Sequence, residues 1–256
     1  MKEDQECLLP SSPHFCVLLP GNFSAMKFGA FLSVFVFSIS AAAIPGAMKA
    51  GTISGIDVSS TQGRNINWSK VKSNGIHFAF VKATEGTSYV NPDFSSQYSG
   101  ATKVGLIRGS YHFAHPGSSS GSAQATYFIK HGGGWSKDGI TLPGALDFEA
   151  GCNGLSHSAM VAWIKSFSDR YHSSEGRYPI LYIRTNWWKS CTGNSASFGS
   201  KNPLWLASWA SSMGPLPAGW KSATFWQYTN HSSSNPGDQN EFHGDLKALR
   251  KLALGP

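Results

Sequence analysis

The stretch Ile140-Thr141-Leu142-Pro143-Gly144-Ala145-Leu146-Asp147-Phe148-Glu149 runs from apolar residues into two carboxylates separated by a single residue. An apolar run of this length predicts a buried strand, and a strand points alternate side chains to the same face, so Asp147 and Glu149 should project together, roughly 6.6 Å apart along the backbone. Two neighbouring carboxylates repel each other, which raises the pKa of one of them. A protonated acid beside an ionised one is suited to cleaving a glycosidic bond. Taken alone, the three residues fit equally well with two solvated carboxylates in a loop.

The first part of the chain has the features of a targeting region. Residues 27–47 have a basic start, an apolar centre and a small-residue end, which is the layout of a secretory signal peptide and is too short for a stable membrane anchor. Met26 directly precedes this segment, so residues 1–25 are expected to be an upstream extension from a mis-chosen start codon, or else a leader that is removed. We therefore expect a signal peptide region over residues 26–50, one folded domain over residues 51–256, and a secreted, extracellular product.

Two of the four cysteines, Cys152 and Cys191, lie in the expected domain. An even pair in an exported chain predicts one disulfide, here closing a loop of about 40 residues. Two unpaired, buried thiols are the alternative.

The charge distribution narrows the choice of partner. The formal net charge is +7 with only 14% charged residues, and the Lys and Arg residues are scattered without a basic run or an arginine-rich helix. Such scattering argues against nucleic acid, whereas a diffuse positive field in a secreted protein favours anionic polymers such as bacterial cell walls. The 9 Trp and 8 Tyr residues fit sugar stacking and a large core equally well.

Short apolar runs recur along the expected domain, and helix-compatible segments separate the first five of them. Strands are predicted at 54–59, 77–82, 105–113, 140–149, 179–183, 203–209, 224–228 and, more weakly, 238–242, with helices at 67–72, 94–102, 122–130 and 156–171. This alternation predicts parallel strands in an α/β layer, and eight strands predict a closed, TIM-like barrel whose last helices are missing.

A barrel of this kind should carry its chemistry at the C-terminal ends of the strands. Residues capable of chemistry or sugar binding do lie at these predicted ends: Asp57, Glu85, Tyr111, His112, Asp147, Glu149, Tyr182, Trp209, Gln227 and Asp238. Five of the 11 carboxylates in the expected domain belong to this set, a concentration that surface solubility would not require. The carboxylate pair is therefore interpreted as functional.

Six short motifs, taken together, resemble glycoside hydrolase family 25 lysozymes, the Chalaropsis-type muramidases. The motifs are Gly55-Ile56-Asp57-Val58-Ser59, Phe80-Val81-Lys82-Ala83-Thr84-Glu85-Gly86, Gly109-Ser110-Tyr111-His112-Phe113, Leu146-Asp147-Phe148-Glu149, Trp226-Gln227-Tyr228 and Asp238-Gln239-Asn240-Glu241-Phe242. The resemblance extends over residues 53–250. It implies a modified β/α barrel of five βα units plus three further strands, and hydrolysis of the β-1,4 bond between N-acetylmuramic acid and N-acetylglucosamine in peptidoglycan, with no cofactor or metal. A monomer is expected.

The resemblance also implies individual roles. Glu149 would be the general acid that protonates the leaving oxygen, and Asp147 would stabilise charge at the sugar or position its N-acetyl group. Substrate-binding positions follow from the resemblance or from the strand ends: Asp57, Asp238, Tyr111, Tyr182, Glu85, Trp209 and Gln227. The long side chain of Glu149 can reach the glycosidic oxygen, and neighbouring carboxylates should raise its pKa. The spacing leaves the stereochemical outcome open.

Three other interpretations compete with this one. His112 and His115 could form a metal site with the carboxylates, but a hydrogen-bonded groove histidine and a loop histidine are favoured, since no zinc-binding motif is present. A chitinase-type barrel is the enzymatic alternative, although it usually shows a longer Asp series before its Glu. A non-catalytic glycan-binding module on the same barrel is the alternative from another class.

Overall fold

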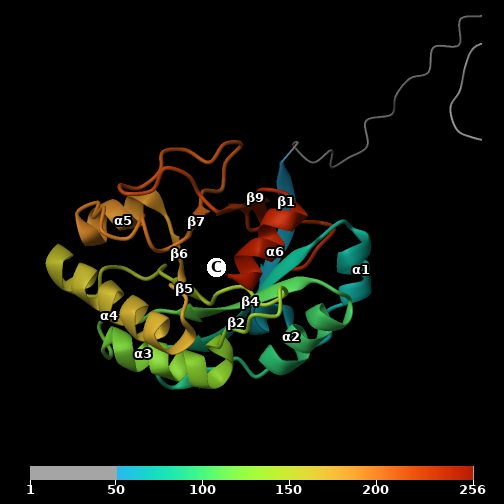
Figure 1. The fold of residues 1–256 in the computed structure, drawn as a ribbon, viewed down its shortest axis with the longest axis horizontal. Coiled ribbons are helices and arrows are strands. Elements are labelled where there is room, and N and C mark those ends of the chain that lie inside the picture. The colour runs from blue at the N-terminus through green and yellow to red at the C-terminus, as the bar shows by residue number, and fades with distance from the viewer. Residues whose placement is uncertain (1–50, 256) are drawn as a thin grey trace, which may run out of the picture. The chain divides into compact units, whose positions relative to one another are not determined.

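The computed structural model describes residues 51–255, and the predictions made for residues 1–50 lie outside them. One sheet contains all the strands of the described part, in the order β1-β9-β8-β7-β6-β5-β4-β2-β3, and β1 also pairs with β2. That last pairing closes eight strands into a barrel, with the short β3 at its edge. Figure 1 labels most of the barrel strands. The strands are β1 (Thr52–Val58), β2 (Phe78–Glu85), β3 (Tyr89–Val90), β4 (Ile107–Phe113), β5 (Ala145–Asp147), β6 (Ile180–Ile183), β7 (Leu204–Ala207), β8 (Phe225–Thr229) and β9 (Asp238–His243).

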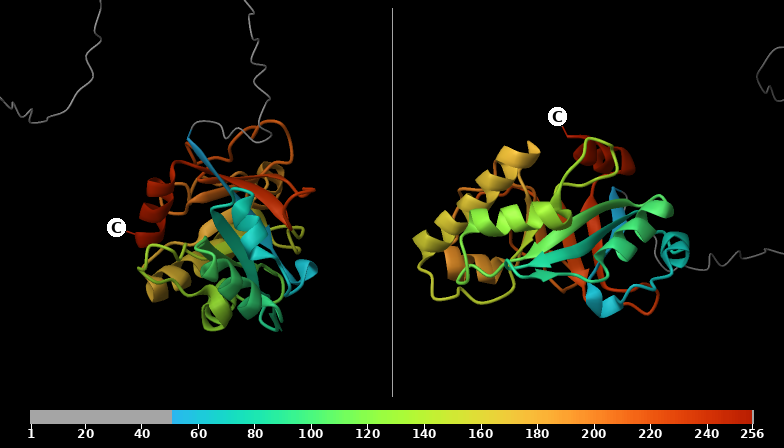
Figure 2. Two further views of the ribbon diagram at one scale, coloured as in Figure 1. Left: turned by 90° about the vertical axis from the view of Figure 1, so that its right-hand side faces the viewer. Right: turned by 90° about the horizontal axis from the view of Figure 1, so that it is seen from below.

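Five βα units and three further strands make up the barrel, as predicted. The helices are α1 (Trp68–Ser73), α2 (Phe94–Lys103), α3 (Gly121–Phe128), α4 (His157–Glu175), α5 (Thr185–Thr192) and α6 (Leu246–Leu254), with short 3-10 and π turns at Ser60–Gln62 and Ile129–Gly133. Helix α5 completes the fifth unit, and neither it nor α6 was predicted from the sequence. Helices α3, α4 and α5 cover one side of the barrel, while α1 and α2 cover the other (Figures 1 and 2).

One strand departs from the predicted parallel arrangement. β9 runs antiparallel to both of its neighbours, β8 and β1, whereas the barrel pairings that do not involve β9 are parallel. Only residues 230–237 connect β8 to β9, fewer than a crossover between parallel strands needs, so β9 returns as a hairpin and runs in the opposite direction. The mouth of the barrel therefore collects the C-terminal ends of seven strands and the beginning of β9, where Asp238 lies.

Alternation along the strands separates the barrel interior from the helical layer. On β2, Phe78 and Phe80 face inward and pack with Trp205 and Phe225, and the rings of Phe80 and Trp205 stack with their centroids 4.5 Å apart. The intervening residues of β2 face outward into the core under α1 and α2. The aromatic layer fills the barrel below its mouth, so a ligand can enter only from the ends of the strands.

Helix α4 has the capping residues and the apolar face that its sequence pattern predicts. Ser156 caps its first turn by accepting a hydrogen bond from the backbone of Ala159, and Gly176 ends it in the left-handed conformation with a φ of 68°. The predicted apolar face is buried against the sheet: Met160, Trp163, Ile164 and Phe167. At the opposite end of the barrel from the mouth, Leu249 and Ala253 of α6 pack into the interior.

Within residues 51–255, no helix combines the length and the apolar character needed to cross a membrane.

Candidate active site

A narrow pocket at the barrel mouth gathers most of the residues predicted from the strand ends. It encloses about 20 Å³ and is lined by Asp57, Tyr111, Asp147, Glu149, Tyr182, Trp205 and Gln227. These side chains come from β1, β4, β5, β6, β7 and β8 and from the residue two positions after β5. The inward direction follows from the strand period of two, since Ala145 and Tyr182 belong to the interior cluster and Asp147 shares the face of Ala145.

Asp57 is the most extensively hydrogen-bonded carboxylate of the pocket. Its Oδ2 accepts hydrogen bonds from the side-chain amides of Gln227 at 2.9 Å and Asn240 at 2.7 Å. Burial, followed by the charge of Asp238, raises the pKa of Asp57 to about 8, and the two amide donors offset only part of this effect. Asp238 lies directly opposite Asp57 in the β1–β9 ladder, which explains the strength of their repulsion.

Gln227 connects this carboxylate to the aromatic rim. Its Oε1 accepts hydrogen bonds from the Tyr182 hydroxyl at 2.9 Å and from the Trp209 indole at 2.8 Å, so its amide nitrogen must face Asp57. Trp209 is 46% exposed and lies in an adjoining groove rather than in the pocket itself. Tyr182 of β6, Gln227 of β8 and Trp209, two residues after β7, thus form one hydrogen-bonded chain.

Sequence reasoning missed two members of the network and one cation at the mouth. The Trp205 indole donates a 2.8 Å hydrogen bond to the amide oxygen of Asn240, which directs the amide nitrogen of Asn240 toward Asp57. The signal for Asn240 was present, because it shares the inward face of β9 with Asp238 at a spacing of two. Arg184 lies directly after β6 and outside the strand predicted at 179–183, so the spacing of two along a strand could not assign its side chain to a face.

Asp147 and Glu149 meet in the pocket, as their spacing predicted. Burial and then the charge of Glu149 raise the pKa of Asp147 well above its ordinary value. The Oδ1 atom of Asp147 is buried and has no hydrogen-bond partner in the described part of the chain. A buried polar atom without a partner is rare in proteins, and in a pocket it indicates where a ligand donor would bind.

Glu149 differs from Asp147 in exposure. The residue is exposed at the rim, but partial burial raises the pKa of its carboxyl, while Arg184, Lys82 and a side-chain hydrogen bond with Asp147 lower it. The predicted direction of the shift is therefore correct, but its cause is loss of solvent contact rather than repulsion by neighbouring acids. Repulsion acts instead on Asp147 and Asp238, whose pKa values Glu149 raises; burial is the larger cause in both, and the pKa of Asp238 reaches about 6.

Glu85 forms ion pairs with Lys82 and His115 instead of lining the pocket. One of its oxygens lies 2.6 Å from Nζ of Lys82 and the other lies 2.7 Å from Nε2 of His115. Although burial by itself would raise the pKa of Glu85, the hydrogen bonds from Lys82 and His115 lower it. Glu85 does not line the pocket, but its charge and that of Lys82 both act on the pKa of Asp147, Lys82 lowering it and Glu85 raising it.

His112 lies outside the groove, contrary to the expectation of a groove histidine. It is fully buried on the outer face of β4, where Nδ1 lies 2.7 Å from the Thr84 hydroxyl and Nε2 lies 3.0 Å from the amide oxygen of Gln124. The inward direction at this point belongs to Tyr111, one residue earlier. Among residues 51–255, no group of three His, Cys, Asp or Glu side chains is arranged to hold a metal ion.

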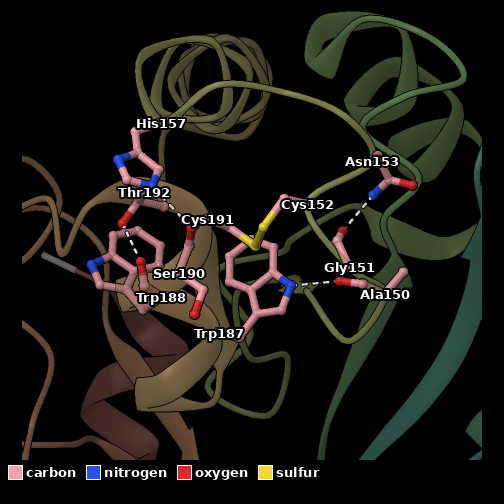
Figure 3. Close-up of a disulfide and its surroundings, with 10 residues drawn as sticks. All are labelled: Ala150, Gly151, Cys152, Asn153, His157, Trp187, Trp188, Ser190, Cys191 and Thr192. Atoms are coloured by element: carbon pink, nitrogen blue, oxygen red, sulfur yellow. Dashed lines mark hydrogen bonds between the residues drawn. A yellow bond between two sulfur atoms is a disulfide. The ribbon is translucent and has the colours of Figure 1, made fainter.

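The predicted disulfide is present and holds the segment that follows Glu149. Cys152 and Cys191 are bonded with Cα atoms 5.1 Å apart, which joins this segment to α5 (Figure 3). Beside the bond, the Trp187 indole donates a hydrogen bond to the backbone oxygen of Ala150 (Figure 3). The Trp187 ring also stacks on Phe148 at 4.7 Å. The backbone on both sides of Glu149 is thereby fixed.

Comparison with known proteins agrees with this geometry. The model of the family described as glycosyl hydrolases family 25 matches residues 56–237. An N,O-diacetylmuramidase of Chalaropsis sp is 54% identical over 213 residues, covering 80% of this chain and 100% of that protein. Lysozyme M1 of Streptomyces globisporus is 46% identical, covering 78% of this chain and 71% of that protein.

Solved structures show the same relationship in three dimensions. A muramidase from Trichobolus zukalii superposes with a TM-score of 0.78 at 50% identity, covering 80% of this chain and 100% of that one. A family GH25 lysozyme from Aspergillus fumigatus superposes with a TM-score of 0.77 at 47% identity over the same shares of the two chains. The extent of the family match and the identity over complete relatives establish that this chain is a member of glycosyl hydrolase family 25.

Proposed function

We propose that this protein is a muramidase that hydrolyses the β-1,4 bond between N-acetylmuramic acid and N-acetylglucosamine in bacterial peptidoglycan. The observation that carries the proposal is that Asp57 of β1 meets Asp147 and Glu149, from the end of β5, around one pocket, with Asp238 of β9 opposite Asp57. The names of the related proteins, N,O-diacetylmuramidase and lysozyme, support the choice of substrate.

Glu149 is assigned the role of general acid. It lies at the exposed rim, where its long side chain can reach a glycosidic oxygen, and partial burial raises its pKa so that it holds a proton more readily. Arg184 and Lys82 act in the opposite direction, which keeps this proton transferable. A raised pKa is the property that a catalytic acid needs near neutral pH.

Asp147 is assigned the role of orienting the N-acetyl group of the sugar. Its unpartnered Oδ1 is buried in the pocket and can accept a hydrogen bond from the acetamido N–H of the substrate. Such a donor favours the ionised form of Asp147, which then stabilises positive charge developing at the sugar. The acetamido oxygen, oriented in this way, would attack the anomeric carbon while Glu149 protonates the departing oxygen.

The surrounding groups position the sugar and the acids. Asp57, with a pKa of about 8, holds its proton at neutral pH and can donate a hydrogen bond to substrate from the oxygen that the amides leave free. Tyr111 and Tyr182 provide aromatic walls, and Asp238 lies at the edge. We further propose that the protein acts as a secreted monomer on cell walls, in keeping with the apolar segment at residues 27–47 and the net charge of +7.

The test is a digest of Gram-positive cell walls followed by reduction of the newly formed reducing ends. A muramidase produces reduced muramic acid, whereas cleavage of the other glycosidic bond produces reduced glucosamine. Chitin serves as a parallel substrate. Release of muramic ends supports the proposal, activity on chitin alone would establish a chitinase, and binding to either polymer without new ends would establish a glycan-binding module.

A further inference from the structure

A second groove adjoins the catalytic pocket along the ends of β6 and β7. It encloses about 300 Å³ and is lined by Arg184, Thr185, Asn186, Ala207, Ser208, Trp209, Met213 and Pro215. Trp209 links the groove to the catalytic pocket, because its indole donates to Gln227, which in turn donates to Asp57. A glycan chain bound across the pocket can therefore continue into this groove.

Arg184 provides the positive charge of the groove. Its guanidinium lies 4.3 Å from the centroid of the Trp209 ring, and within residues 51–255 it forms neither an ion pair nor a hydrogen bond. Stacking on an indole restricts the guanidinium to one plane without neutralising its charge. Its N–H donors thus remain available in a geometry that suits a carboxylate.

The acids of the barrel mouth create a need for this cation. Arg184 is close enough to Glu149 and Asp238 for its charge to act on both. A substrate that brings its own carboxylate into this acidic mouth meets repulsion unless a cation accepts the charge. A neutral glycan has no such requirement. Arg184 is therefore placed to separate charged from neutral glycans.

We propose that Arg184, held by Trp209, binds a carboxylate carried by the muramic acid residues of the substrate. This inference rests on the proposed function, and it identifies the part of peptidoglycan that the groove recognises. The carboxylate can come from two sources: the lactyl group of a muramic residue without its peptide, or the peptide attached to that lactyl group. A chitin-type chain carries neither, so it gains nothing from Arg184.

Binding measurements in the Glu149→Gln background test this inference, because substrate remains intact and the pKa of Glu149 no longer matters. Three ligands are compared by calorimetry: peptide-free glycan strands with free lactyl carboxylates, the same strands with these carboxylates converted to methylamides, and soluble strands retaining their peptides. The added variants are Arg184→Gln, Arg184→Lys and, as a matched control, Lys189→Gln, which removes another exposed positive charge from α5.

We expect Arg184→Gln to weaken binding of the free-carboxylate strands about tenfold, as for loss of a hydrogen bond to a charged group, and to leave the methylamide strands unaffected. Arg184→Lys should restore part of the affinity, and Lys189→Gln should have no effect. A loss confined to the peptide-bearing strands would identify the peptide as the source of the carboxylate. An equal loss on methylamide strands, or no loss on any charged strand, would overturn the inference. Failure of the proposed function would differ, since the protein with Glu149 intact would then release no muramic reducing ends.

Discussion

The side-chain amide of Gln227 donates a 2.9 Å hydrogen bond to Asp57, which lies 170 residues earlier in the chain. The amide can face only one way, because its oxygen already accepts from Tyr182 and Trp209. This contact joins β1 to β8, the first and the seventh strands of the barrel in chain order, across β9, which lies between them in the sheet. The geometry of the site is thus a property of barrel closure and not of a single segment.

Replacement of Glu149 by Gln should lower kcat at least a hundredfold, the scale expected for loss of a general acid. The amide preserves the shape of the side chain but has no proton to transfer. Turnover is measured from the release of reducing ends on cell walls, and folding is checked by the thermal unfolding midpoint, which should stay close to that of the wild type.

The matched control is Asp169→Asn, which alters a carboxylate paired with Lys165 on the exposed surface of α4. This variant should keep full activity. Wild-type turnover in Glu149→Gln would show that another group supplies the proton.

Replacement of Asp57 by Asn should raise stability at pH 8 but not at pH 4. The pKa of Asp57 rises from 3.8 to about 8 in the folded protein, so between these values the folded state binds a proton that the unfolded state has released. Stability conferred by this group therefore falls as pH increases from 4 to 8, and it is unchanged below pH 4, where both states are protonated. Asn carries no charge and avoids this loss.

The measurement is chemical denaturation of both proteins at pH 4 and pH 8. The Asn oxygen can still accept the hydrogen bonds from Gln227 and Asn240, so the variant should fold. An identical difference between variant and wild type at the two pH values would contradict a raised pKa at this position.

Breaking the disulfide with the double change Cys152→Ser and Cys191→Ser should lower the free energy of unfolding by about 2–4 kcal/mol. The bond joins residues 39 positions apart, so its loss increases the conformational freedom of the unfolded chain. It also frees the backbone that follows Glu149, and kcat should fall in parallel. Denaturation curves with and without reductant measure the effect. Reductant should destabilise the wild type and leave the curve of the variant unchanged. An unchanged curve for the wild type as well would argue against the bond.

Replacement of His112 by Ala should reduce stability without affecting the chemistry. The side chain is buried outside the barrel. Its removal takes away the hydrogen-bond partner of the buried Thr84 hydroxyl, at a cost of about 1–3 kcal/mol, while the amide of Gln124 keeps its hydrogen bonds with His115. KM and kcat measured well below the unfolding temperature should match those of the wild type, and a chelator should change neither protein. Loss of activity in a fully folded variant would instead place His112 in the reaction.

Much of the fold could be predicted because the apolar runs are strong and local. All eight barrel strands and the first four helices form where the patterns placed them. Their ends agree within a few residues, except that the strand predicted at 140–149 is limited to Ala145–Asp147. Helix α5 was missed because residues 185–192 span only about two turns, so the helical spacing of its buried residues Trp188, Cys191 and Thr192 is too short to stand out, and α6 because it follows the last predicted strand. The direction of β9 depends on how the ring closes, which periodicity does not encode.

The sequence predicted which residues form the site better than it predicted which of them contact each other. The strand period of two places Asp57, Asp147 and Gln227 on the inward face and His112 on the outward face, so the expectation of a groove histidine was inconsistent with this period. Glu85 shares the mouth but is engaged by Lys82 and His115, a pairing between segments 30 residues apart that no local pattern reveals.

The sequence by itself determined which residues could do the chemistry and which face of each strand they occupy, because both depend on residue type and on a spacing of two. Only the tertiary structure decided which carboxyl loses solvent, which oxygen lacks a donor, and that Arg184 stacks on Trp209 beside the acids. Burial, pairing and electrostatic repulsion depend on distances through space, and these distances are set only when the eight strands close around a common mouth.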